Sequence, residues 1–204
     1  MAEVPPEIRP DGRERLLDAT IRHLETHSAS ELRVTAIADE AEVAIGLIRH
    51  HFGSRDGMIA EAQQRRLEGA TRDDIAGART LLAAQDISSL WEGLERLSRA
   101  AVDRDRAAVR LSRFAAVATA HGQPDVRAAI GDTFGDLLDE MATVVREARD
   151  NGLVSTDLDP RAVATFIQAY ALGLLVHDLD PDSVDDAVLV DVIMTALRAI
   201  LCPV

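Results

Sequence analysis

The sequence predicts an all-α fold in two domains, a small N-terminal domain of three helices followed by a larger helical domain. Apolar residues recur every three or four positions along most of the chain, which is the spacing of helices that bury one face. Clusters of Gly, Pro, Asn and Asp separate these segments, and no strand pattern competes. With 204 residues, 47% of them apolar, the chain can fill one substantial core or a small core joined to a larger one.

The chain begins with a lead, residues 1–12, which we expect to be flexible because prolines at positions 5, 6 and 10 interrupt it. The first helix is predicted over 13–24. Five residues of this segment share one helical face: Leu16, Leu17, Thr20, Ile21 and Leu24. We expect this face to cover the apolar side of the segment that follows.

Residues 33–59, RVTAIADEAEVAIGLIRHHFGSRDGMI, predict a short helix, a tight turn at Glu42 and Val43, and a second helix with a polar tip. Helical spacing brings to the inner side Ile37, Ala38, Ala41, Ile48 and Phe52. It leaves on a compact outer surface Ile45, Gly46, Arg49, His50 and Arg55. Proteins read DNA with such an arrangement, so residues 13–57 are interpreted as a helix-turn-helix DNA-binding domain.

Residues 58–204 are interpreted as the larger helical domain. Ser54 is expected to cap a helix that runs from about Asp56 to Thr80. Further helices are predicted near 87–102, 105–120, 124–150, 159–178 and 184–201. The breaks between the later ones are supplied by Gly122-Gln-Pro124, Asn151-Gly152 and Asp157-Leu-Asp-Pro160.

Particular residues of the helix-turn-helix stand at intervals more specific than helical periodicity. They are Ile37-Ala38, Ala41, Val43, Gly46, His51-Phe52, Ser54-Arg55-Asp56 and Met58. This pattern resembles that of the TetR family of transcriptional regulators, which runs from Ile-Ala through Ala-Gly-Val-Ser and a Gly to Tyr-x-His-Phe and Ser-Lys-Glu. The chain departs from it at three positions: Glu42 replaces the turn Gly, Ala44 the capping Ser, and Arg49 the phosphate-binding Tyr.

The three departures have different consequences. Glu42 adds negative charge near a phosphate surface, and Ala44 removes a helix cap worth about 1 kcal/mol. Arg49 keeps the phosphate-binding role by another chemistry, because a guanidinium donates planar, charged hydrogen bonds.

The resemblance implies a double-stranded DNA operator as partner. The expected DNA-binding residues are Thr35, Ala44, Ile45, Gly46, Leu47, Arg49, His50, His51 and Arg55. Ile45 and Leu47 would meet thymine methyl groups, and Gly46 would allow close approach of the backbone. Arg49, His50, His51 and Arg55 would mostly hold phosphates. For Ile45 and Leu47 the alternative is a place in the domain core.

The helices near 159–178 and 184–201 are apolar round more than one face. One face can join the core of the larger domain, and a second needs another partner. We therefore expect a homodimer through a two-fold contact of these helices, as the family resemblance also implies, with a larger single core as the alternative. Two recognition helices related by a two-fold axis predict a palindromic operator.

Helical bodies of this family usually enclose a small-molecule site, so the resemblance implies a small apolar or amphipathic effector that releases the operator. Bulky or polar residues on the apolar helices are the candidates for its lining: Trp91, Phe114, Val117, His121, Phe134, Met141, Phe166, Tyr170 and His177. Ordinary core packing is the alternative for each of them.

Charge and residue content exclude several classes of protein. All 22 basic residues are Arg, which removes lysine-based chemistry, and the single Cys202 permits no internal disulfide and no cysteine-based zinc site. His50 and His51 lack metal-ligand spacing, and no nucleophile elbow, phosphate loop, dinucleotide fingerprint or Glu-x-x-His pair is present. We expect neither an enzyme nor a cofactor or metal.

The formal charge of −13 argues against strong non-specific DNA binding, although Arg33, Arg49 and Arg55 cluster with the two histidines. A helical dimer that binds a small molecule or a protein, without DNA binding, therefore remains the alternative function. The N-terminus is polar and broken by prolines, and no apolar run approaches the ~20 residues of a membrane span. We therefore expect a cytoplasmic protein without membrane contact.

Overall fold

The structure is a computed structural model, and it describes residues 11–119 and 124–202. These residues form helices joined by turns, and no strand occurs among them, as the sequence predicts. They divide into two compact units, of which the first ends at Arg66 and the second begins at Leu67. The division falls within helix α4 (Arg55–Thr80), not between residues 57 and 58. Most of the expected lead, residues 1–10, lies outside the described residues, and α1 begins at Gly12.

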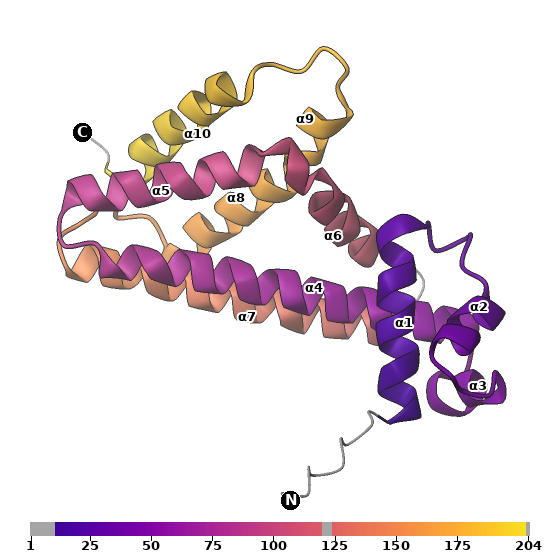
Figure 1. Ribbon diagram of the computed structural model, residues 1–204. Coiled ribbons are helices and arrows are strands. Elements are labelled where there is room, and N and C mark those ends of the chain that lie inside the picture. The colour runs from indigo at the N-terminus through magenta and orange to yellow at the C-terminus, as the bar shows by residue number, and fades with distance from the viewer. Residues whose placement is uncertain (1–10, 120–123, 203–204) are drawn as a thin grey trace, which may run out of the picture. The chain divides into compact units, whose positions relative to one another are not determined.

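The first unit contains α1 (Gly12–Thr26), α2 (Val34–Glu40), α3 (Gly46–Phe52) and the first turns of α4 (Figure 1). α1 packs against both α2 and α3, as its apolar face predicts. Six residues of this core are fully shielded from solvent: Leu16, Leu17, Ala19, Ile37, Met58 and Ala62. The unit is thus held by a tight apolar centre to which each of its helices contributes.

Two glycines shape the junction between α3 and α4. Gly53 has a φ of +72° and its N–H donates to the carbonyl of Arg49 at 3.1 Å, which ends α3. The Ser54 hydroxyl then accepts from the N–H of Gly57 at 3.0 Å, so the predicted cap of α4 is confirmed. A Cβ at Gly57 would overlap the carbonyl oxygen of Phe52. The junction therefore requires a residue without a side chain at position 57.

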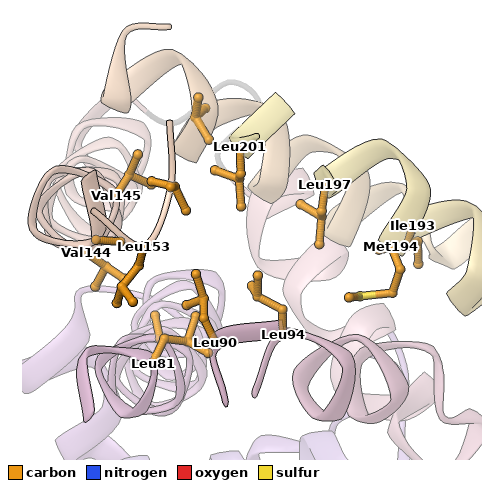
Figure 2. Packing of buried hydrophobic residues seen from close by; sticks show 14 of the residues in the cluster. Leu81, Leu90, Leu94, Val144, Val145, Leu153, Ile193, Met194, Leu197 and Leu201 are labelled. Carbon is orange, nitrogen blue, oxygen red and sulfur yellow. The ribbon is translucent and has the colours of Figure 1, made fainter. Parts of the chain in front are cut away.

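The second unit begins with the remainder of α4 and a short 3₁₀ turn, η1 (Leu81–Ala83). Its helices are α5 (Ile87–Val102), α6 (Ala107–Thr119), α7 (Pro124–Asp150), α8 (Pro160–Gly173), α9 (Leu175–Leu179) and α10 (Asp186–Leu201), with a 3₁₀ turn, η2 (Arg104–Arg106), before α6. α7 packs along α8, and α10 packs along α5. Figure 2 shows side chains of these elements converging on one apolar cluster, including Leu81, Leu94, Val145 and Leu197.

Acidic residues cap several of these helices. Asp86 and Ser89 form a reciprocal capping box at the start of α5, with the Ser89 N–H 2.8 Å from an Asp86 carboxylate oxygen. Asp159 accepts from the N–H of Ala162 at 2.9 Å beside Pro160, and Asp185 accepts from the N–H of Ala187 at 2.8 Å. Part of the acidic surplus of the chain therefore stabilises helix starts.

Two predicted helices differ from those observed. The segment 105–120 begins as η2, where the Asp103 carboxylate accepts from the N–H of Asp105, and only then becomes α6. The segment 159–178 is two helices, because the chain breaks at Leu174. There the N–H of His177 donates to the Leu174 carbonyl only three residues back, and the Leu174 side chain turns into the core. Gly173, a weak helix former, precedes the break.

Candidate nucleic-acid interface and effector cavity

The turn between α2 and α3 is fixed by its backbone. Glu42 has a φ of +53°, in the left-handed region where a side chain is strained by about 1 kcal/mol or more. Its N–H donates to the Asp39 carbonyl at 3.1 Å, and the N–H of Val43 donates to the Ala38 carbonyl at 3.0 Å. Glu42 therefore adopts a conformation that a Gly takes without strain.

This turn sets which face of α3 is buried. Ile48 is buried in the first core, and Phe52 and Leu47 pack partly against it. On the opposite side Ile45 is 49% exposed, and Gly46, Arg49 and His50 are exposed with it. The core alternative thus does not describe Ile45, whereas Leu47 is shared between core and surface.

The starts of α2 and α3 carry no side-chain cap. In α3 the N–H of Leu47 bonds to the Ala44 carbonyl at 2.9 Å, so the exposed Ala44 contributes its backbone only. Thr35 is exposed in the first turn of α2. Thr35 and Ala44 are therefore both accessible to another molecule.

Among the arginines of the first unit that reach solvent, two groups differ in their partners. Several are paired with carboxylates: Arg13 with Glu61, Arg22 with Glu40 at 2.7 Å, and Arg65 with Glu14 at 2.6 Å. Arg33 and Arg49 are exposed and have no ion-pair or hydrogen-bond partner within residues 11–66. These two guanidinium groups are free to bind an external anion.

Arg55 belongs to neither group. Its Nη2 donates to the carbonyls of Ala29 at 2.5 Å and Leu32 at 3.1 Å, and its Nη1 donates to an Asp56 carboxylate oxygen at 3.0 Å. These hydrogen bonds give Arg55 a structural role within the first unit, and its expected phosphate contact stays a prediction. Its guanidinium ties the turn between α1 and α2 to the start of α4.

The ring of His51 makes edge-to-face contacts with the rings of His50 and Phe52. The ring centroids of His50 and His51 are 4.8 Å apart in a T-shaped contact, and those of His51 and Phe52 are 6.1 Å apart. Within residues 11–119 and 124–202 no group of three or more His, Cys, Asp or Glu could hold a metal ion. His50 is exposed, whereas His51 is half-buried.

The second unit encloses a cavity of about 220 Å³. Its walls are mostly aliphatic and belong to the cluster in Figure 2: Leu81, Leu90, Leu94, Val144, Val145, Leu197 and Leu201, with Ala101, Ala171 and Met141 among the smaller or softer neighbours. An apolar cavity with a few polar groups on its wall is the usual form of a small-molecule site.

A buried ion pair stands at the wall of this cavity. The Arg110 guanidinium donates from Nε to Asp178 Oδ2 at 2.6 Å and from Nη2 to Asp178 Oδ1 at 2.5 Å, and both side chains are 6% exposed. Arg110 also donates to the carbonyls of Ala101 and Asp103. The hydrogen bonds from Arg110 hold the pKa of the Asp178 carboxyl below its usual value, so the pair stays ionised at neutral pH.

Other polar groups line the same cavity. Arg113 pairs with Asp74 at 2.8 Å, and its Nε is buried without a hydrogen-bond partner. Burial raises the pKa of the Tyr170 phenol, so the phenol is neutral at physiological pH. Arg106 lines the cavity without an ion-pair or hydrogen-bond partner for its side chain among the described residues.

The cavity contains two of the nine lining residues predicted from the sequence, Met141 and Tyr170. Phe114 and Phe166 are instead 49% and 45% exposed, and Phe134 borders a much smaller void. His177 is buried but bonds to Asp186 at 2.9 Å. Trp91 and Val117 do not line the cavity, and His121 lies outside the described residues.

Sequence reasoning missed the charged members of the wall because it searched for bulk. A usable signal was present: Arg110 and Arg113 interrupt the otherwise apolar run AAVRLSRFAAV, and Asp178 follows a long apolar segment. Charged residues on helices that must bury apolar faces need partners, since an unpaired buried charge is strongly unfavourable.

Large apolar side chains remain exposed on the last three helices. The most exposed are Val176 at 73%, Leu179 at 71% and Val192 at 61%, with Phe166, Val184 and Val188 near them in sequence. Residues 160–179 are also long and apolar enough to cross a membrane, so the expectation that no run approaches that length is wrong. Only 22% of this apolar stretch is buried, which leaves much of it for another partner.

Two family descriptions match the chain. That of the TetR-family bacterial regulatory proteins matches residues 16–62, and that of the C-terminal domain of BetI-type transcriptional repressors matches residues 92–202. The second match alone covers more than half of the chain. The chain therefore belongs to the TetR family, with a C-terminal domain of the BetI type.

Relatives and solved structures agree with this placement. The regulator BetI of Burkholderia thailandensis is 27% identical over 103 residues, which are 50% of this chain and 43% of that protein. BetI 2 of Chromohalobacter salexigens is 33% identical over 75 residues, 37% of this chain and 36% of that protein. The chain thus matches less than half the length of these relatives.

Among solved structures, a transcriptional regulator from Rhodococcus sp. RHA1 superposes with a TM-score of 0.73 at 15% identity, covering 92% of this chain and 96% of its own. A regulator from Saccharomonospora viridis in complex with choline superposes with a TM-score of 0.67 at 20% identity, covering 92% and 95%. These similarities confirm the all-α fold, with a helix-turn-helix domain followed by a larger helical domain.

Proposed function

We propose that this chain is a cytoplasmic, homodimeric transcriptional repressor that binds a palindromic DNA operator and is released by a small apolar or amphipathic molecule. The outer face of α3 carries the proposal, because it presents Ile45, Arg49 and His50 to solvent from a helix-turn-helix of known family. The free guanidinium groups of Arg33 and Arg49 would bind phosphates, and Ile45 would contact base edges in the major groove.

The remaining predicted contacts follow from exposure. Thr35, Ala44 and Gly46 are exposed and would offer hydroxyl or backbone groups to the DNA. His50 and His51 would add phosphate contacts, and Leu47 would contribute its solvent-facing edge. Arg55 would contribute indirectly, because its hydrogen bonds hold the start of α4 in place.

DNA binding is tested by fluorescence anisotropy with the duplex immediately upstream of the coding region, over a salt series. We expect saturable binding that resists competitor DNA. Arg49→Ala should weaken it and lower the slope of log K against log salt by about 1, the signature of one lost phosphate contact. Arg99→Ala, which removes the same charge from an exposed pair on α5, should leave both unchanged.

Dimerisation would use the exposed apolar faces of α8 and α10. A charge placed there must be desolvated in the dimer, so Val192→Glu should yield a monomer in sedimentation velocity. Ile87→Glu is the matched control, because Ile87 is comparably exposed at 51% but lies at the start of α5. A monomeric wild-type chain, or a dimer in the Val192 variant, would contradict this interface.

The cavity of the second unit would hold the effector. The effector would bind more tightly to the conformation of the protein that releases DNA than to the one that binds it, and would thereby lower the affinity for DNA. The choline complex of the Saccharomonospora viridis regulator supports small-molecule binding by this fold. Operator-bound protein should release labelled DNA when the correct ligand is added, which anisotropy measures directly.

The alternative is a helical dimer that binds a small molecule or a protein and not DNA. The formal charge of −13 and the exposed Glu42 beside α3 favour it. Absence of binding both to the upstream duplex and to a pool of random duplexes at low salt would establish this alternative against the repressor.

A further inference from the structure

Some of the charged side chains on the wall of the aliphatic cavity have an ion-pair partner and others have none. Five charged side chains line it: Asp73, Asp74, Arg106, Arg110 and Arg113. Arg110 is neutralised by Asp178, and Arg113 by Asp74. Of the two that remain, Asp73 is exposed to water, which screens its charge, whereas Arg106 is partly buried.

The three arginines lie along one strip of the chain. Arg106 ends η2, and Arg110 and Arg113 follow on α6 at intervals of four and three residues, which places them on one helical face. The Arg110 guanidinium donates hydrogen bonds to Asp178 and to two carbonyls. The donors left over are the guanidinium of Arg106 and the buried, unpartnered Nε of Arg113.

The rest of the wall does not suit a cationic head group. Quaternary ammonium groups are recognised over the faces of several aromatic rings, and Tyr170 is the one aromatic residue among the described residues of this wall. Trp91 does not line the cavity, and the guanidinium of Arg198 lies over its ring at 5.5 Å from the centroid. Asp74, the partly shielded carboxylate, already has both oxygens engaged by Arg113.

We propose that the cavity binds an aliphatic monocarboxylate, with its chain among the leucine and valine side chains and its carboxylate on Arg106. One uncompensated guanidinium matches one negative charge, and its planar fork matches the two oxygens of a carboxylate. The Arg113 Nε supplies a further donor at the same wall, and the neutral Tyr170 phenol a polar but uncharged group. The inference rests on the proposed function, since it names the class of effector for that site.

The test compares three probes with the same eight-carbon chain and different head groups: octanoate, octan-1-ol and octyltrimethylammonium. Binding to the full chain is measured by isothermal titration calorimetry without DNA. We expect octanoate to bind at least about tenfold more tightly than the other two, the factor that a charge-assisted hydrogen bond supplies. Equal binding of the three, preference for the ammonium, or no octanoate binding would overturn the proposal.

Two variants assign the effect to Arg106. Arg106→Gln has no ion pair to lose and should fold, yet octanoate should bind to it no better than octan-1-ol. Arg72→Gln removes the same charge from an exposed position of α4 outside the cavity wall and should keep the wild-type preference. Undiminished octanoate binding by Arg106→Gln would also overturn the proposal.

Anisotropy of labelled upstream duplex on the same samples separates this proposal from the proposed function. If octanoate binds to the protein but the labelled DNA stays bound, the result would support the carboxylate site and contradict the role of octanoate as an effector. DNA release by octyltrimethylammonium and not by octanoate would support a ligand-responsive regulator and overturn the carboxylate site.

Discussion

The two units of this chain use similar helices to build different interiors. The first unit closes on Leu16, Leu17 and Ile37, which are completely shielded from solvent. The second unit builds a larger apolar cluster yet leaves a cavity of about 220 Å³, with an ion pair 6% exposed at its wall. A unit that presents a fixed surface gains from close packing, whereas a unit that receives a ligand must keep space open.

The largest expected effect comes from breaking the buried ion pair of the second unit. Asp178→Asn leaves the Arg110 charge buried without its partner and should lower the free energy of unfolding by about 3–5 kcal/mol at neutral pH. Urea unfolding followed by the fluorescence of Trp91, the single tryptophan, measures it. Glu95→Gln, which breaks an exposed pair with Arg99, should cost under about 1 kcal/mol. Equal losses of stability in the two variants would mean that the buried ion pair contributes no more to stability than the exposed one.

The same pair predicts the acid sensitivity of the second unit. The folded pKa of Asp178 is lowered by its hydrogen bonds with Arg110, with His177 and Arg104 adding smaller attractions. Its contribution is therefore fully present above the unfolded pKa of about 4 and is lost as the pH falls through the folded pKa. In the same urea assay below pH 4, the wild-type chain should lose stability more steeply than Asp178→Asn. Parallel pH profiles would assign the acid sensitivity to other carboxyl groups.

A matched pair of enlargements tests the contrast in packing itself. Ala38 is 3% exposed in the first core, so Ala38→Leu should destabilise the chain by about 1–3 kcal/mol through overpacking. Ala171 lines the cavity, where the added side chain has room, so Ala171→Leu should cost less than about 1 kcal/mol. Thermal unfolding by circular dichroism ranks the two. The reverse order would show that the cavity wall is as closely packed as the first core.

The smallest expected effect concerns the turn between α2 and α3 in the first unit. Glu42→Gly relieves the left-handed backbone, but the greater freedom of Gly in the unfolded chain offsets part of the gain, so the chain should be stabilised by at most about 1 kcal/mol. Glu42→Gln removes the same charge and keeps the strain, so it should not stabilise. Both should bind DNA more tightly, because a negative charge leaves a phosphate surface. Stabilisation by the Gln variant would assign the effect to charge instead of backbone conformation.

Local sequence signals predicted much of the fold. Helix 124–150 begins at Pro124 and ends before Asn151-Gly152, as predicted, because caps and breakers act within a few residues of themselves. The break at Leu174 was not predictable from periodicity, since the apolar pattern continues through it. It depends on where the Leu174 side chain finds the core, which is a tertiary effect.

The candidate site divides in the same way. The exposure of Ile45, Arg49 and His50 follows from helical spacing and was predicted. The hydrogen bonds that Arg55 makes within the chain were not predicted, because they go to the carbonyls of residues 29 and 32, in a turn that spacing does not place beside it. The cavity wall depends likewise on which helices meet, so a search for bulky residues found Met141 and Tyr170 and missed the arginines.

The glycine at position 57 has a consequence for mutational tolerance. A Cβ there would overlap the Phe52 carbonyl oxygen, whereas a Cβ at Gly46 would meet nothing within 4 Å. A saturation library read out by folding should therefore accept many residues at position 46 and essentially glycine alone at position 57. The exposed side of α3 can therefore vary at position 46, whereas the junction between α3 and α4 cannot vary at position 57.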